Sequence, residues 1–128
     1  MTAARNDIKL IYEEGLASGN PGKDLVDAIL ESNDCHYILL AGKNWKHFNC
    51  EAGQRKLIAA GDIEHVHKAG IFWPGFDYML GMDFLEYSAN EEYLYRSGRF
   101  WPGYDHRRGL EILGKMKSAR YIYYAGKE

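Results

Sequence analysis

The chain has 128 residues, of which 46% are hydrophobic and 14% aromatic, so its length fits one domain and its composition excludes a disordered chain. The formal net charge is −2, and no stretch approaches the ~18 consecutive apolar residues of a transmembrane helix. The first residues lack the apolar run of a signal peptide, and Cys35 and Cys50 have no metal-type spacing. We therefore expect a single cytoplasmic domain over residues 1–128, with no membrane association and with both cysteines as free thiols.

A repeat with a period of 28 residues organises the sequence. The segment Ala69–Asp77 aligns without a gap with Ser97–Asp105, and Trp45, Trp73 and Trp101 fall in one column. A fixed period of roughly 20 to 50 residues is typical of stacked repeat architectures. Repeat units are predicted to begin near residues 6, 34, 62 and 90, with a half unit from residue 118.

Each unit is predicted to begin with a short helix. Residues of the preferred N-cap set recur at its first position, namely Asn6, Asp34, Asp62, Asn90 and Ser118. An apolar stretch follows, and a glycine is predicted to end it, because glycine adopts the left-handed conformation after a helix without a Cβ penalty. The predicted closing glycines are Gly42, Gly70, Gly98 and Gly126.

A turn that carries the tryptophan is predicted to lead into a second helix. Pro74 and Pro102 in this turn cannot continue the first helix, since proline lacks the amide hydrogen. The N-caps predicted for the second helix are Asn49, Asp77 and Asp105. A glycine inside a helix costs about 1 kcal/mol relative to alanine, so its recurrence in one column needs a reason. We expect Gly53, Gly81 and Gly109 to make room for the ring of their own unit's tryptophan.

The expected fold is therefore all-α, with two-helix units stacked as a right-handed α-solenoid. The first unit is degenerate, with Ala17 in the tryptophan column, as expected of a terminal repeat. The run Ala59–Val66 resembles an ankyrin repeat, in which a helix ends in Ala-Ala, a glycine follows and an acid-containing helix begins. The period of 28 residues departs from the roughly 33 residues of ankyrin units, so no family is assigned.

The sequence holds no zinc signature, P-loop, dinucleotide fingerprint or nucleophile elbow. His65 and His67 lie two residues apart on a predicted helix, so they point to different faces and do not form a metal-binding pair. We therefore predict no catalytic residue, no metal ligand and no cofactor. A small enzyme of unknown class remains an alternative.

Charge is distributed unevenly along the chain. Residues 1–92 carry 8 basic and 15 acidic side chains, whereas residues 93–128 carry 8 basic and 3 acidic ones. Basic and aromatic residues interleave in the fourth unit, a mixture that can hold phosphate and stack bases. Nucleic-acid binding is therefore the first alternative function.

The favoured function is that of a protein-protein interaction or adaptor module, because repeat arrays present extended surfaces. The half unit at the carboxyl end carries an apolar run, which predicts a homodimer through the C-terminal helix. The residues predicted to bind a partner are Tyr95, Arg96, Arg99, Arg107, Arg108, Tyr121, Ile122 and Tyr124.

Overall fold

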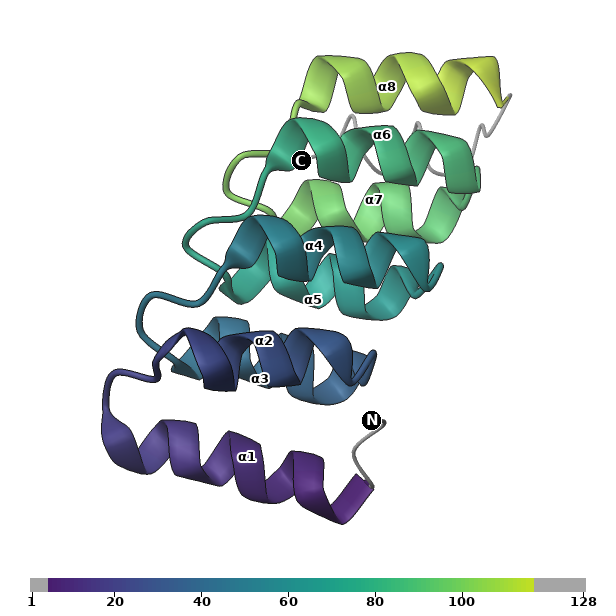
Figure 1. The fold of residues 1–128 in the computed structure, drawn as a ribbon. Coiled ribbons are helices and arrows are strands. Elements are labelled where there is room, and N and C mark those ends of the chain that lie inside the picture. Colours follow the sequence, from purple (N-terminus) through teal and green to yellow (C-terminus); the bar gives the residue numbers. More distant parts are fainter. Residues whose placement is uncertain (1–4, 117–128) are drawn as a thin grey trace. The chain divides into compact units, whose positions relative to one another are not determined.

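The computed structural model describes residues 5–116, which form eight α-helices and no strand (Figure 1). The predicted all-helical class is thus confirmed for this part of the chain. The chain divides into two compact units, Met1–Phe76 and Asp77–Glu128. The first unit contains α1 (Arg5–Ser18), α2 (Lys23–Glu31), α3 (Cys35–Asn44), α4 (Cys50–Ala59) and α5 (Ile63–Phe72). The second unit contains α6 (Tyr78–Ser88), α7 (Glu91–Phe100) and α8 (His106–Lys115).

Two layers of helices make up the first unit. Helices α1, α3 and α5 pack side by side in one layer, and α2 and α4 form the other (Figure 1). The side chains of Ile29, Ile38, Leu57 and Val66 between these helices are fully buried. Burying aliphatic side chains stabilises the fold by roughly 1.5 to 3 kcal/mol each, so this apolar core holds the layers together.

Helix α7 is the centre of the second unit, because it contacts both α6 and α8. Leu85, Leu94 and Leu113, one from each helix, are buried in its core. The Tyr78 ring also meets the edge of the Trp101 ring, with 5.7 Å between the ring centroids. Apolar packing therefore ties all three helices of this unit together.

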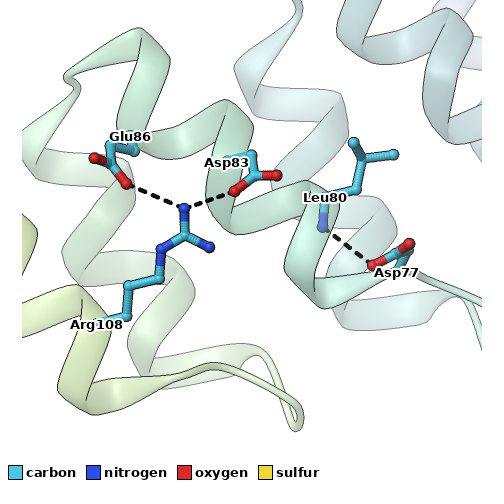
Figure 2. Close-up of polar contacts among 5 residues, drawn as sticks. All are labelled: Asp77, Leu80, Asp83, Glu86 and Arg108. Atoms are coloured by element: carbon cyan, nitrogen blue, oxygen red, sulfur yellow. Dashed lines mark hydrogen bonds and ion pairs between the residues drawn. The ribbon is translucent and has the colours of Figure 1, made fainter.

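Six of the eight described helices begin where the sequence predicts. Six predicted N-cap residues accept a hydrogen bond on Oδ1 from the backbone N–H three residues further on, as Figure 2 shows for Asp77 and Leu80. These six residues are Asp34, Asn49, Asp62, Asp77, Asn90 and Asp105. Asn6 is different, because it lies inside α1 rather than before it. Ser118 lies outside the described residues.

The prediction that glycines end the first helix of each unit is wrong. Gly42, Gly70 and Gly98 lie inside α3, α5 and α7, which continue to the residue before the tryptophan. A Cβ atom on Gly42 would overlap the Trp73 indole, and one on Gly98 would lie 3.0 Å from the Tyr104 ring. These two glycines are therefore needed for space rather than for a left-handed turn. Gly126 lies outside the described residues.

The left-handed residue instead follows the second helix in the first three repeats. Asn33, Gly61 and Ala89 have φ values of 56°, 68° and 51°, and they recur with the 28-residue period. Each one directly precedes the N-cap of the next helix. The left-handed residue therefore lets the chain reverse in the two or three residues that separate the second helix from the next one.

Tryptophan connects successive repeats inside the first unit. Trp45 and Trp73 are buried, and their indole N–H groups donate to the backbone carbonyls of Tyr12, at 3.3 Å, and Leu39, at 3.0 Å. Each acceptor belongs to the first helix of the preceding repeat. Gly15 leaves room for the Trp45 indole, and Gly42 leaves room for that of Trp73, because a Cβ atom on either glycine would overlap the ring. Each indole is thus held by a hydrogen bond and fits into the space that a glycine leaves.

The glycines inside the second helices face a different ring from the one expected. A Cβ atom on Gly53 would lie 2.8 Å from the Phe48 ring of its own repeat and 2.9 Å from Trp73 of the next. One on Gly109 would meet the ring of Tyr104, which occupies the Phe48 column. The expectation that these glycines make room for their own repeat's tryptophan is therefore wrong at both positions. Gly81 is buried inside α6.

Candidate functional site

A cavity of about 530 Å³ opens between α7 and α8. We call it the α7–α8 groove, and its principal lining residues are Leu94, Tyr95, Gly98, Tyr104, Gly109 and Leu113. Its lining mixes apolar and aromatic residues with the polar side chains of Arg99 and His106, and two of its wall positions carry no side chain. Concave, largely apolar sites of several hundred Å³ are the usual size for binding a small molecule or an inserted side chain.

Tyr104 is one of the polar residues that line the groove. Its Oη donates a hydrogen bond to the carbonyl oxygen of Leu94 at 2.9 Å, and its ring meets the Trp101 ring edge-on with centroids 6.1 Å apart. Burial, together with the nearby charge of Asp105, raises the pKa of the phenol to about 12. The hydroxyl is therefore a neutral donor at physiological pH, and its role is to hold the ring in place.

The rim of the groove combines a cation with exposed apolar surface. Arg99 lies over the rings of Tyr95 and Phe100, with its guanidinium carbon 6.0 and 5.6 Å from their centroids. Leu110 also lines the groove and keeps 41% of its surface exposed. An apolar floor with an aromatic and cationic rim suits an aromatic side chain, because cations attract the faces of aromatic rings.

The structure separates the residues that the sequence predicted to bind a partner. Tyr95 and Arg99 line the α7–α8 groove. Arg96 lies 3.5 Å from Glu92 on its own helix, and Arg107 lies 3.6 Å from Glu111. Tyr121, Ile122 and Tyr124 lie outside the described residues.

Arg108 is held between two carboxylates of α6 (Figure 2). Its Nη2 lies 2.6 Å from Asp83 Oδ1 and 3.0 Å from Glu86 Oε1. These two hydrogen bonds raise the pKa of the Arg108 guanidinium. A phosphate group would have to displace both carboxylates to reach it, which weakens the case for Arg108 as a nucleic-acid contact.

A second cavity, of about 350 Å³, lies beside Arg108. Its charged lining residues are Glu86, Asp105, Arg107, Arg108, Glu111 and Lys115, three of each sign. The basic residues of this region are thus interspersed with acidic ones. These residues therefore do not form the continuous positive stripe that is typical of a nucleic-acid-binding surface.

One cluster in the first unit brings a thiol, a carboxylate and an imidazole together. Asp62 Oδ2 lies 2.8 Å from His65 Nδ1, and the Asp62 side chain also bonds Cys35. Burial alone raises the pKa of Asp62, but the hydrogen bonds and charge of His65 outweigh it and lower that pKa below its ordinary value. Burial and the charges of Asp62 and Asp34 raise the pKa of the Cys35 thiol. A nucleophilic cysteine needs the opposite shift, so this arrangement favours a capping role.

Among the described residues, no group of three His, Cys, Asp or Glu side chains is placed to hold a metal ion. None of the described helices is long and apolar enough to cross a membrane. No family model matches the chain, and neither curated proteins nor solved structures provide a significant match.

Sequence reasoning missed most of the groove. The patterns in the sequence assign Leu94, Gly98, Leu110 and Leu113 to repeat structure. Tyr104 enters only as one of the aromatic rings of the nucleic-acid alternative. One signal is present in the sequence, because the groove residues occupy the same repeat columns as residues that surround Trp73. Recognising it requires knowing that this tryptophan packs against the preceding repeat.

Proposed function

We propose that this chain is a small cytoplasmic protein-binding module, a right-handed α-solenoid of 28-residue repeats that receives a partner protein in the α7–α8 groove. The observation that carries the proposal is the groove itself. It combines about 530 Å³ of space with an apolar floor, exposed Leu110 and a cationic rim at Arg99. Protein interfaces are typically centred on such pockets, into which a partner inserts an anchoring side chain.

The periodic contacts of the first unit support the solenoid architecture. Trp45 and Trp73 each bond the first helix of the preceding repeat, with matching glycines at Gly15 and Gly42. Repeated units that contact only their neighbours build extended arrays. The fourth sequence repeat, which begins at residue 90, has the same pattern, so the array is proposed to extend to α8.

The test is affinity capture from the native host with the full-length chain and two variants. Leu110→Glu places a charge in the groove, and Met79→Glu places the same charge at another exposed apolar position, in α6. Both side chains are exposed, so neither variant should lose helicity by circular dichroism. We expect mass spectrometry to find a protein retained by the wild type and by Met79→Glu and lost from Leu110→Glu.

Each other outcome decides against the proposal. Capture that disappears after nuclease treatment would assign the chain to nucleic acid. A protein retained equally by all three chains would place the interface elsewhere than in the groove. Turnover of a small molecule that Leu110→Glu abolishes would favour the enzyme alternative.

A further inference from the structure

The indole of Trp73 occupies a well-defined socket in the first unit. Its N–H donates to the Leu39 carbonyl at 3.0 Å, and Gly42 and Gly53 leave the space that the ring fills. The Phe48 ring meets the indole at 70°, with centroids 5.8 Å apart. Four positions therefore make the socket: a backbone carbonyl, two glycines and an aromatic ring.

The same four positions recur two periods later, in the α7–α8 groove. Two periods of 28 residues carry Leu39, Gly42, Phe48 and Gly53 onto Tyr95, Gly98, Tyr104 and Gly109. All four of these residues line the groove. Both glycines and the aromatic ring are preserved, and the Tyr95 carbonyl falls in the column of the indole acceptor. The Tyr104 ring is the side chain nearest to both glycines, 3.0 Å from a Cβ atom on Gly98 and 2.8 Å from one on Gly109, so an inserted indole has to pack beside this ring or move it. The groove thus has the wall chemistry of a tryptophan socket.

The rim reproduces a second contact of the occupied socket. In the first unit Lys43 Nζ lies 4.2 Å above the ring of Phe72, the residue directly before Trp73. Two periods on, Lys43 corresponds to Arg99, which lines the groove. Arginine stacks on aromatic faces at least as well as lysine does. The rim therefore suits an aromatic residue that immediately precedes the inserted tryptophan.

This chain does not supply the occupant from its own tryptophans. Trp45, Trp73 and Trp101 are 6%, 3% and 3% exposed, so a second copy would have to expose one of them to insert it. Residues 117–128 contain no tryptophan. An indole that fills the groove therefore comes from outside residues 1–128.

We infer that the α7–α8 groove is a tryptophan-acceptor socket, which binds a partner protein through an aromatic residue followed by tryptophan at the end of a helix. The inference rests on the proposed protein-binding function and names the chemistry of the partner. The indole N–H is the specific element, because a buried N–H needs an acceptor and a second lone pair of a helical carbonyl provides one.

The probe is a synthetic peptide of residues 62–77, the segment that delivers Phe72 and Trp73 to the equivalent socket. It is titrated into the full 128-residue chain by isothermal calorimetry. We expect saturable binding at one site per chain. A peptide with Trp73→Ala should bind at least about tenfold more weakly, as expected when an interface anchor is truncated.

Variants of the chain show where the peptide binds. Leu110→Glu should weaken binding of the tryptophan peptide about tenfold or more, and Met79→Glu should leave it unchanged. A peptide that instead displaced α5 from the first unit would bind both variants equally. That result would overturn the assignment of the groove, as would equal affinity for the Trp73→Ala peptide.

Absence of saturable binding would also overturn the inference, including the case in which residues 117–128 or a second copy fill the groove. The protein-binding function and the tryptophan inference can fail separately. A partner captured through Leu110 whose binding survives replacement of its own tryptophans would retain the function and reject the socket. If no protein is captured and no peptide binds, both are rejected.

Discussion

At the scale of single residues, glycine has two distinct roles in this chain. Gly42 and Gly53 are helical and buried, and a side chain is excluded at both positions because a Cβ atom would meet the Trp73 ring. A Cβ atom on Gly61 would have nothing within 4 Å. Glycine is favoured there by the backbone conformation instead, because its φ is 68°. The sequence predicted that glycine recurs but did not separate these roles, because steric contacts between residues as far apart as Gly42 and Trp73 are not visible in local patterns.

Replacing Gly42 by alanine is expected to destabilise the protein, although alanine is the better helix former. The added methyl group would overlap the Trp73 indole, and overpacking a core costs about 1 to 3 kcal/mol. Gly114 in α8 has nothing within 4 Å of its Cβ position, so Gly114→Ala should stabilise by up to about 1 kcal/mol. Urea unfolding of the two variants measures both changes, and a shift of the same sign would contradict the space argument.

Replacing Ala89 by glycine is expected to stabilise the protein. Ala89 adopts φ 51° and ψ 37°, a left-handed conformation that is unfavourable for a residue with a Cβ atom. The expected gain in free energy of unfolding is roughly 0.5 to 1 kcal/mol, after allowing for the extra entropy of glycine in the unfolded chain. Ala28→Gly, inside α2, is the control and should destabilise by about 1 kcal/mol. A lower thermal midpoint for Ala89→Gly would show that this conformation is not strained.

At the scale of elements, helix starts were predictable and helix ends were not. Asp34, Asp62 and Asn90 cap their helices through contacts with residues only three positions away, so sequence alone reveals them. The ends depend on the tryptophans, whose backbone N–H groups close the helices. Trp73, for example, donates to the Ala69 carbonyl at 2.8 Å and takes an extended conformation. The recurring glycine, which lies before the tryptophan in each repeat, indicates an earlier end than the one that this bond sets.

Arg108 is expected to contribute modestly to the pairing of α6 and α8. Its guanidinium contacts Asp83 and Glu86, and the whole side chain is 27% exposed. Such partly exposed ion pairs are worth up to about 1 kcal/mol. Arg108→Met should therefore lower the free energy of unfolding by less than about 1 kcal/mol, and the loss should shrink at about 1 M salt because ions screen the pairs. Arg107→Met is the matched control, since Arg107 is 92% exposed and contacts Glu111 on its own helix. Equal losses in the two variants would leave no role for the inter-helix contacts.

At the scale of the whole molecule, the α7–α8 groove could not have been found from composition or motif. Tyr95 and Arg99 can be identified as candidates from the sequence because an aromatic ring and a positive charge are evident from the residue type alone. Gly98 and Gly109 define the groove by lacking side chains, and both leave room for the Tyr104 ring, as Gly42 and Gly53 do for Trp73. Contacts between residues of different helices create this relation. A linear pattern shows the repeat but not which repeat holds which ring.

The proposed homodimer is tested separately from the groove. The run Tyr121–Tyr124 lies outside the described residues, and its sequence is predominantly apolar, which is typical of an interface. Residues 93–128 carry 8 basic and 3 acidic side chains, so pairing two such ends opposes like charges. Screening over about 8 to 10 Å weakens that repulsion at physiological salt, whereas apolar burial is not screened.

We therefore expect light scattering at micromolar concentration to give twice the 14.7 kDa chain mass. Ile122→Glu should restore the monomer, and Leu10→Glu, at an exposed apolar position of α1, should not. A wild-type monomer, or a dimer that persists in Ile122→Glu, would remove the C-terminal interface and leave the α7–α8 groove as the remaining proposed contact surface.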